Sequence, residues 1–164
     1  MIIFLSGSIN SGKSTVANGL ANLFDKMAVV EIDCLRDFIK FLPLKEAIPI
    51  NLENTVSIIK NLRKEGIDCV VPYPLGQGNY NFIINSLADY KNETHFFTLS
   101  PSLKTVAKNR GERQLTPDEV ERIKYHYSIG IDKPSFGKII DNTDQTPEQT
   151  TKMIYQEIIS TVKK

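Results

Sequence analysis

A glycine-rich segment near the amino terminus combines the residue types that can hold phosphate groups. Residues 7–15 read GSINSGKST and fit the pattern G-x-x-x-x-G-K-[ST] without a gap. The two glycines allow backbone angles that turn successive amide N–H groups toward one anion, and the helix that follows adds its dipole. The lysine of this pattern reaches the β- and γ-phosphates, and the next hydroxyl binds Mg²⁺. We therefore expect a nucleoside triphosphate with Mg²⁺ to bind at Gly7, Ser8, Asn10, Ser11, Gly12, Lys13, Ser14 and Thr15.

Such a loop needs a strand before it and a helix after it, and the sequence predicts both. Residues 1–5 form a short apolar run, which is typical of a strand buried in a parallel sheet. Apolar residues then repeat at helical spacing after the lysine. Further strands are predicted at residues 27–32, 67–71, 95–99 and 138–140, and further helices at 52–62, at 80–89 and after the capping boxes that begin at Thr116 and Thr146. This alternation indicates an α/β fold with a parallel sheet.

Length and composition narrow the class of protein. A chain of 164 residues is most simply one domain, residues 1–164, with a sizeable core. The 20 Lys and Arg nearly balance the 19 Asp and Glu, so nucleic acid is not a favoured partner, although a local basic groove is compatible with this balance. Two cysteines, no signal-peptide pattern and no apolar stretch long enough to span a membrane indicate a cytoplasmic protein with free thiols. We expect Cys34 to be buried.

Two classes of P-loop protein fit the sequence poorly. Signalling GTPases carry the motifs D-x-x-G and N-K-x-D, and neither motif occurs here. Large motor ATPases carry an acidic residue at the end of a later apolar strand. In this chain the strand predicted at residues 67–71 leads into Pro72-Tyr73-Pro74 instead.

An acidic residue does follow the strand predicted at residues 27–32, and it is Asp33, with Arg36 three positions later. A carboxylate at this place could accept the proton of an attacking hydroxyl or hold the water shell of a metal. An arginine fork suits a phosphate, a sulfate or a carboxylate. Because the carboxyl ends of neighbouring strands face one crevice, we expect Asp33 to face Lys13. A helix cap for Asp33 and a solvated helix position for Arg36 are the alternatives.

With these motifs, the chain resembles the small P-loop kinases. The succession of GSINSGKST, IDCLR at residues 32–36, RGER at 110–113 and IIDNT at 139–143 is similar to the adenylate, shikimate and adenylylsulfate kinase group. The resemblance implies a P-loop NTPase three-layer fold, with a five-stranded parallel sheet in the order 2-3-1-4-5, helices on both faces and ATP·Mg²⁺ as the donor. It also implies a short lid at about residues 109–117, in which Arg110 and Arg113 hold the phosphates or stack on adenine. Residues 142–147 would border the adenine.

Two regions could bind the acceptor. The first is about residues 33–50, an apolar and aromatic stretch broken by Pro43 and Pro49, for which simple core packing is the alternative. The second is the loop at residues 72–82, whose glycines and turn formers suit an approach to a ligand. This loop loosely resembles the Pro-Tyr stretch of adenylylsulfate kinases, so we assign Tyr73 to the acceptor, although the arginine that follows in those enzymes is absent.

Neither histidine is expected to act in the site. His95 and His126 have no Cys or His nearby at metal-ligand spacing.

The sequence therefore predicts a transferase, an ATP-binding P-loop kinase that phosphorylates a small molecule. Lys13, Asp33 and Arg110 are its expected catalytic residues, Ser14 and Asp33 its metal ligands, and Arg36 grips the acceptor. Two alternatives stay open: a nucleotide or polynucleotide 5′-hydroxyl kinase, in which a D-x-x-R also occurs, and an ATP-binding regulatory module without an acceptor. No membrane partner is expected.

Overall fold

The computed structural model describes residues 1–109 and 113–162 of the chain. Within these residues, five parallel strands form one sheet in the order β2-β3-β1-β4-β5. The strands are β1 (Ile2–Gly7), β2 (Met27–Val29), β3 (Asp68–Pro72), β4 (Thr94–Leu99) and β5 (Lys138–Ile140). The expected strand order is confirmed.

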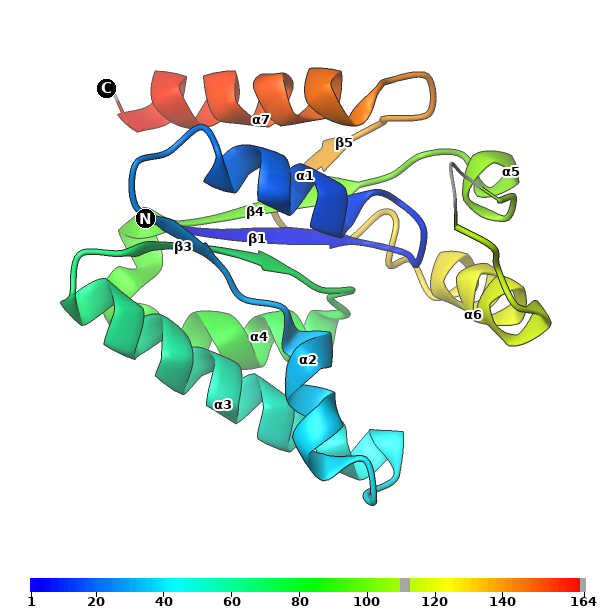
Figure 1. The fold of residues 1–164 in the computed structure, drawn as a ribbon, viewed down its shortest axis with the longest axis horizontal. Coiled ribbons are helices and arrows are strands. Elements are labelled where there is room, and N and C mark those ends of the chain that lie inside the picture. Colours follow the sequence, from blue (N-terminus) through cyan, green and yellow to red (C-terminus); the bar gives the residue numbers. More distant parts are fainter. Residues whose placement is uncertain (110–112, 163–164) are drawn as a thin grey trace.

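Helices cover both faces of the sheet, as Figure 1 shows. One face carries α1 and α7, the other carries α3 and α4, and α5 and α6 lie beyond the ends of the central strands (Figure 1). The helices are α1 (Lys13–Ala21), α2 (Ile32–Arg36), α3 (Leu44–Lys64), α4 (Gln77–Ser86), α5 (Leu103–Val106), α6 (Pro117–Ser128) and α7 (Pro147–Val162), with short 3₁₀ helices η1 (Asp37–Ile39) and η2 (Ala88–Glu93). Because all strands are parallel, the segments that leave their carboxyl ends gather at one edge of the sheet.

Alternate side chains of β1 enter two separate cores. Ile2 and Phe4 join the core under α3 and α4, whereas Ile3 and Leu5 join the core under α1 and α7. All four side chains have no exposed surface. A strand covered on both faces must be apolar at every position, which explains the continuous run that the sequence shows here. The burial fixes β1, and hence the loop that follows it, at the centre of the molecule.

The second strand is shorter than expected, and Asp33 does not lie at its end. Pairing with β3 stops after the amide N–H of Val30 donates to Val70 O at 2.9 Å. Glu31 then caps α2, so Asp33 lies in the first turn of that helix. A short apolar run cannot distinguish a strand from the start of a buried helix, since both need apolar side chains. Cys34, which we expected to be buried, is exposed, because Ile32 is the buried residue of α2.

The helix predicted at residues 52–62 begins eight positions earlier, and Pro49 lies inside it. Pro43 is the capping residue, and its carbonyl accepts from the amides of Glu46 and Ala47, both at 3.0 Å. Proline removes one N–H donor from a helix, but the helix continues here because Ala47 and Leu52 on either side of Pro49 are buried. The break that we expected at Pro49 is therefore absent, whereas a break is present at Pro43, which separates η1 from α3.

The other elements agree with the expectations more closely. β3, β4 and β5 lie within one residue of the predicted ranges, and α4 begins three residues before the predicted helix. Both capping boxes are present, at the start of α6 and of α7. Among the described residues, no helix is both long enough and apolar enough to cross a membrane.

The capping box of α6 joins the start of this helix to Arg113. Thr116 Oγ1 accepts from the amide of Glu119 at 3.2 Å, and Glu119 Oε2 accepts from the amide of Thr116 at 3.0 Å. The other carboxylate oxygen of Glu119 accepts from Arg113 Nη2 at 2.7 Å. This box therefore sets the direction of α6, and its glutamate also holds Arg113, which precedes the helix.

Replacing Thr116 by Ala should lower the free energy of unfolding by about 1 kcal/mol, because the amide of Glu119 loses its side-chain acceptor. Thr116→Ser keeps the hydroxyl and is the matched control, since serine caps a helix at least as well as threonine. Urea denaturation followed by circular dichroism measures both variants. Equal stability of the Ala and Ser variants would contradict this role of the cap.

Candidate active site

The P-loop, residues 7–15, connects the end of β1 to the start of α1. Three of its residues have positive φ angles: Gly7 with φ 136°, Asn10 with φ 63° and Gly12 with φ 96°. The amide of Ser11 donates to Ser8 O at 3.3 Å, which closes the loop into a tight turn. The side chain of Lys13 folds back over this turn, and its ammonium group donates to Ser8 O at 2.6 Å. The predicted succession of strand, glycine loop and helix is present.

Contacts with three other parts of the chain hold the P-loop. Asn10 Nδ2 donates to Val106 O at 2.9 Å and to Lys108 O at 2.8 Å, at the end of α5. Asn142 Nδ2, from the segment after β5, donates to Ser11 O at 3.0 Å. These bonds join the loop to the segments that follow β4 and β5.

His126 on α6 makes the third of these contacts with the P-loop. It is buried, and its Nδ1 lies 3.2 Å from the hydroxyl oxygen of Ser8. Burial, helped by the charges of Arg122 and Lys13, lowers the pKa of His126 to about 4. The imidazole is therefore neutral at neutral pH, and it fixes α6 against the loop without adding charge.

A cavity of about 510 Å³ opens over the P-loop, and we call it the P-loop cavity. The side chains of Lys13, Ser14 and Thr15 line it from α1, and Glu31 and Asp33 line it from the segment after β2. Among the described residues, the lining is Ile9, Asn10, Gly12, Lys13, Ser14, Thr15, Glu31, Asp33, Pro72, Pro74, Arg113 and Pro147. The expectation that Asp33 faces Lys13 is met, although Asp33 reaches the cavity from a helix rather than from a strand end.

Lys13 is the central cation of the P-loop cavity. Desolvation lowers its pKa from 10.5 to about 8, while the carboxylates of Asp33 and Glu31 oppose this shift and the charge of Arg113 adds to it. The ammonium is thus poorly solvated and lies among carboxylates and a carbonyl oxygen. An anion with several negative oxygens would solvate it far better.

A second cavity, of about 660 Å³, adjoins the P-loop cavity, and we call it the acceptor-side cavity. It is lined by α2, by the start of α3, by the loop after β3 and by one face of α6. Asp33 and Arg113 line both cavities, together with Ile9 and Pro74. The carboxylate of Asp33 is therefore available to groups bound in either space.

The structure does not bring every predicted residue to the place that we expected. Tyr73 lines the acceptor-side cavity, and burial, followed by the charge of Asp33, raises the pKa of its hydroxyl. Arg36 lines the same cavity, but it is engaged by the backbone: Nη1 donates to Ile39 O at 3.1 Å and Nη2 to Leu42 O at 2.8 Å. Two of its donor groups are therefore already engaged, and its grip on an acceptor stays a prediction. Arg110 lies outside the described residues.

Three residues that the sequence analysis missed or dismissed line the cavities or hold the loop. They are Arg122, His126 and Asn142. A signal for the first two exists in their spacing, because Glu119, Arg122, His126 and Ile129 recur every three or four positions and so share one face of α6. No local signal marks Asn142, whose partner Ser11 is 131 positions away.

The donor set of the P-loop cavity fits an Mg²⁺ ion that arrives with phosphate. The hydroxyl of Ser14 and the carboxylate of Asp33 line the same space as Lys13. Within residues 1–109 and 113–162, no group of three or more His, Cys, Asp or Glu could hold a metal ion by itself. Mg²⁺ is commonly bound by one or two protein oxygens together with phosphate oxygens, and this arrangement matches that chemistry.

Comparison with known proteins supports the architecture. No protein-family model and no curated protein sequence matches this chain. Solved structures do match. The tunicamycin resistance protein of Deinococcus radiodurans is 18% identical with a TM-score of 0.69, and the match covers 96% of this chain and 94% of that one. A sugar kinase of Janibacter is 16% identical with a TM-score of 0.72, and the match covers 96% of this chain and 94% of that one. The APS kinase of Mycobacterium tuberculosis, solved with AMPPNP and APS, is 19% identical with a TM-score of 0.65, and the match covers 99% of this chain and 97% of that one.

These structural matches, which also include a shikimate kinase and a thymidylate kinase, show that the chain has the P-loop kinase-like fold. At such low identities the likeness extends to the fold alone. The acceptor of each enzyme is a property of that enzyme.

Binding of ATP at pH 8.5 should take up protons, because a polyphosphate raises the pKa of Lys13 from about 8 toward its usual value. The affinity should accordingly fall as the pH rises through about 8, where the free lysine loses its charge. Isothermal titration calorimetry in two buffers of different ionisation enthalpy measures the number of protons. Lys13→Arg is the control, since arginine stays charged, and equal proton uptake by both proteins would refute the assignment.

Proposed function

We propose that this chain is an ATP-dependent kinase that transfers the γ-phosphoryl group to a hydroxyl of a small-molecule acceptor. The observation that supports this proposal best is the position of Asp33, which lines both the P-loop cavity and the acceptor-side cavity. A regulatory nucleotide-binding module needs only the first of these spaces. A phosphotransferase needs both, with a group at their junction that can act on the attacking hydroxyl.

On the donor side, the P-loop would hold the triphosphate. Its amide N–H groups and the amino terminus of α1 bind phosphate oxygens, and Lys13 leaves the carbonyl of Ser8 to meet the β- and γ-phosphates. Ser14 and Asp33 would hold Mg²⁺, which when bound neutralises the charge on the β- and γ-phosphate oxygens. Pro147 and Thr15 line the same cavity farther along, so the adenine would border the segment before α7.

On the acceptor side, Asp33 would orient the acceptor hydroxyl and accept its proton. The hydroxyl oxygen forms a bond to the γ-phosphorus while the bond from that phosphorus to the bridging oxygen breaks, and ADP leaves. Lys13 and the lid arginines, Arg110 and Arg113, would stabilise the charge that spreads over the moving phosphoryl oxygens. Arg113 lines both cavities and pairs with Glu119, so a change in that ion pair would let it follow the phosphate.

The test is ADP release from ATP·Mg²⁺ across a panel of acceptors. The panel holds nucleoside monophosphates, adenylylsulfate, shikimate-like hydroxy acids, aminoglycosides and other hydroxylated drugs, and 5′-hydroxyl oligonucleotides. We expect an acceptor-dependent turnover that Asp33→Asn lowers by about 10²-fold or more, since a positioned base contributes about 10²–10⁴-fold. Asp37→Asn is the matched control, because Asp37 is exposed, lines neither cavity and pairs with Lys40.

Lys13→Ala should lower turnover at least about 10²-fold, as the loss of a contact to developing charge typically does. Near-normal turnover of either Lys13→Ala or Asp33→Asn would refute the mechanism. Tight binding of ATP with no acceptor-dependent turnover would instead favour the regulatory module.

A further inference from the structure

The acceptor-side cavity has a large apolar wall. Among the described residues, six aliphatic side chains and two tyrosines line it: Ile9, Ile32, Leu44, Ile48, Ile129, Ile131, Tyr73 and Tyr125. Its volume of about 660 Å³ lies in the range of sites for drug-sized ligands. A small polar acceptor would leave much of this wall in contact with water. The wall therefore fits a molecule with an extended apolar body.

The charges of this cavity do not cancel. Among the residues that the structure describes, three arginines and two carboxylates line it, an excess of one positive charge. Arg113 is paired with the carboxylate of Glu119, and Arg36 donates to two backbone carbonyls. Asp33 faces the buried ammonium of Lys13, which lies in the adjoining cavity. Arg122 is thus the arginine of this cavity for which the described residues supply neither a carboxylate nor a carbonyl partner.

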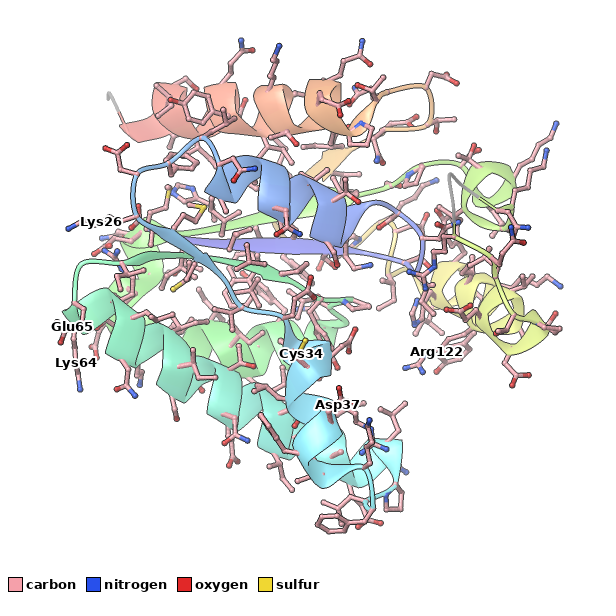
Figure 2. The ribbon with its side chains drawn as sticks, viewed as in Figure 1. Lys26, Cys34, Asp37, Lys64, Glu65 and Arg122 are labelled. Atoms are coloured by element: carbon pink, nitrogen blue, oxygen red, sulfur yellow. The ribbon has the colours of Figure 1, made fainter. Side chains whose placement is uncertain are left out.

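Arg122 makes no hydrogen bond and no ion pair with any part of the chain that the structure describes. It lies on the face of α6 that also carries Glu119, His126 and Ile129, and all four side chains line the acceptor-side cavity. In Figure 2 its side chain projects from α6 toward α2. A guanidinium with five donors at the wall of an apolar cavity suits a carboxylate, sulfonate or phosphate group of a ligand.

From the apolar wall and from a guanidinium that has no partner among the described residues, we propose that the acceptor is an amphipathic hydroxylated anion, and that Arg122 rather than Arg36 recognises its anionic group. This inference rests on the proposed kinase function. It places the reacting hydroxyl at Asp33, the apolar body against the isoleucines of the wall, and the anionic group at Arg122. Arg36 instead shapes the cavity by holding the backbone of residues 39–42.

The test uses two fluorescent probes that share an apolar body and differ in charge. 8-Anilinonaphthalene-1-sulfonate carries a sulfonate, and N-phenyl-1-naphthylamine is neutral. The protein should bind the anionic probe about tenfold or more tightly than the neutral one, as expected for a hydrogen bond to a charged group. Arg122→Gln should remove this difference by weakening only the anionic probe. Ile129→Ser, at a half-exposed position of the wall, should weaken both probes.

Two controls make the assignment specific. Lys124→Gln removes a cation from the same helix that pairs with Glu121 and does not line the cavity, so it should leave both affinities unchanged. The double variant Phe38→Ser and Phe41→Ser removes the exposed aromatic side chains near η1, which could bind dyes outside the cavity. It should also leave both affinities unchanged.

The proposal is overturned if neither probe binds, if Arg122→Gln leaves the anionic probe unaffected, or if the Phe38 and Phe41 substitutions abolish binding. These outcomes do not depend on ATP or on turnover. If the probe-binding test fails while acceptor-dependent ADP release is observed, the amphipathic anion is rejected as the substrate class and the kinase proposal still holds.

Discussion

The P-loop is held in a turn that its own sequence stabilises only in part. Asn10 and Gly12 have left-handed backbone angles, which are unfavourable for residues with a side chain and least so for asparagine. The side chain of Asn10 offsets this cost by donating to two carbonyls at the end of α5. Asn142 and His126 bind the loop from two other segments. These contacts therefore help to fix the direction of the amide groups of the loop.

Through these contacts α6 both supports the P-loop and forms part of the wall of the acceptor-side cavity. Its buried histidine lies against the P-loop, whereas its neighbours Arg122 and Ile129 line the acceptor-side cavity. Because the imidazole of His126 is neutral, it places no second positive charge beside the poorly solvated ammonium of Lys13. This lowers the electrostatic cost of packing α6 against the P-loop. The capping box at Thr116 fixes where this helix begins. A small rotation of α6 would move both the support of the loop and the wall of the cavity.

Features that depend on neighbours in sequence were predicted well. The P-loop, its helix and both capping boxes follow from residues within about ten positions of one another. The continuous apolar run of β1 predicted a strand covered on both faces, and the strand order came from the resemblance to P-loop kinases. The boundary between β2 and α2 was predicted wrongly, because Val30 and Ile32 are apolar in either structure. The length of α3 was missed for a related reason, since Pro49 predicted a break that packing of the neighbouring residues overrides.

The sequence by itself determined the phosphate-binding loop, because its geometry depends on glycine backbone freedom and on a lysine and a serine at adjacent positions. Only the tertiary structure decided which arginine the backbone engages. Arg36 and Arg122 have the same chemistry, and they differ because backbone carbonyls lie within reach of Arg36, while Arg122 has no such partner among the described residues. The role of His126 also depends on the tertiary structure, because its contact with Ser8 joins residues 118 positions apart. Whether a polar group is paired depends on where the chain returns in space, and local spacing does not contain that information.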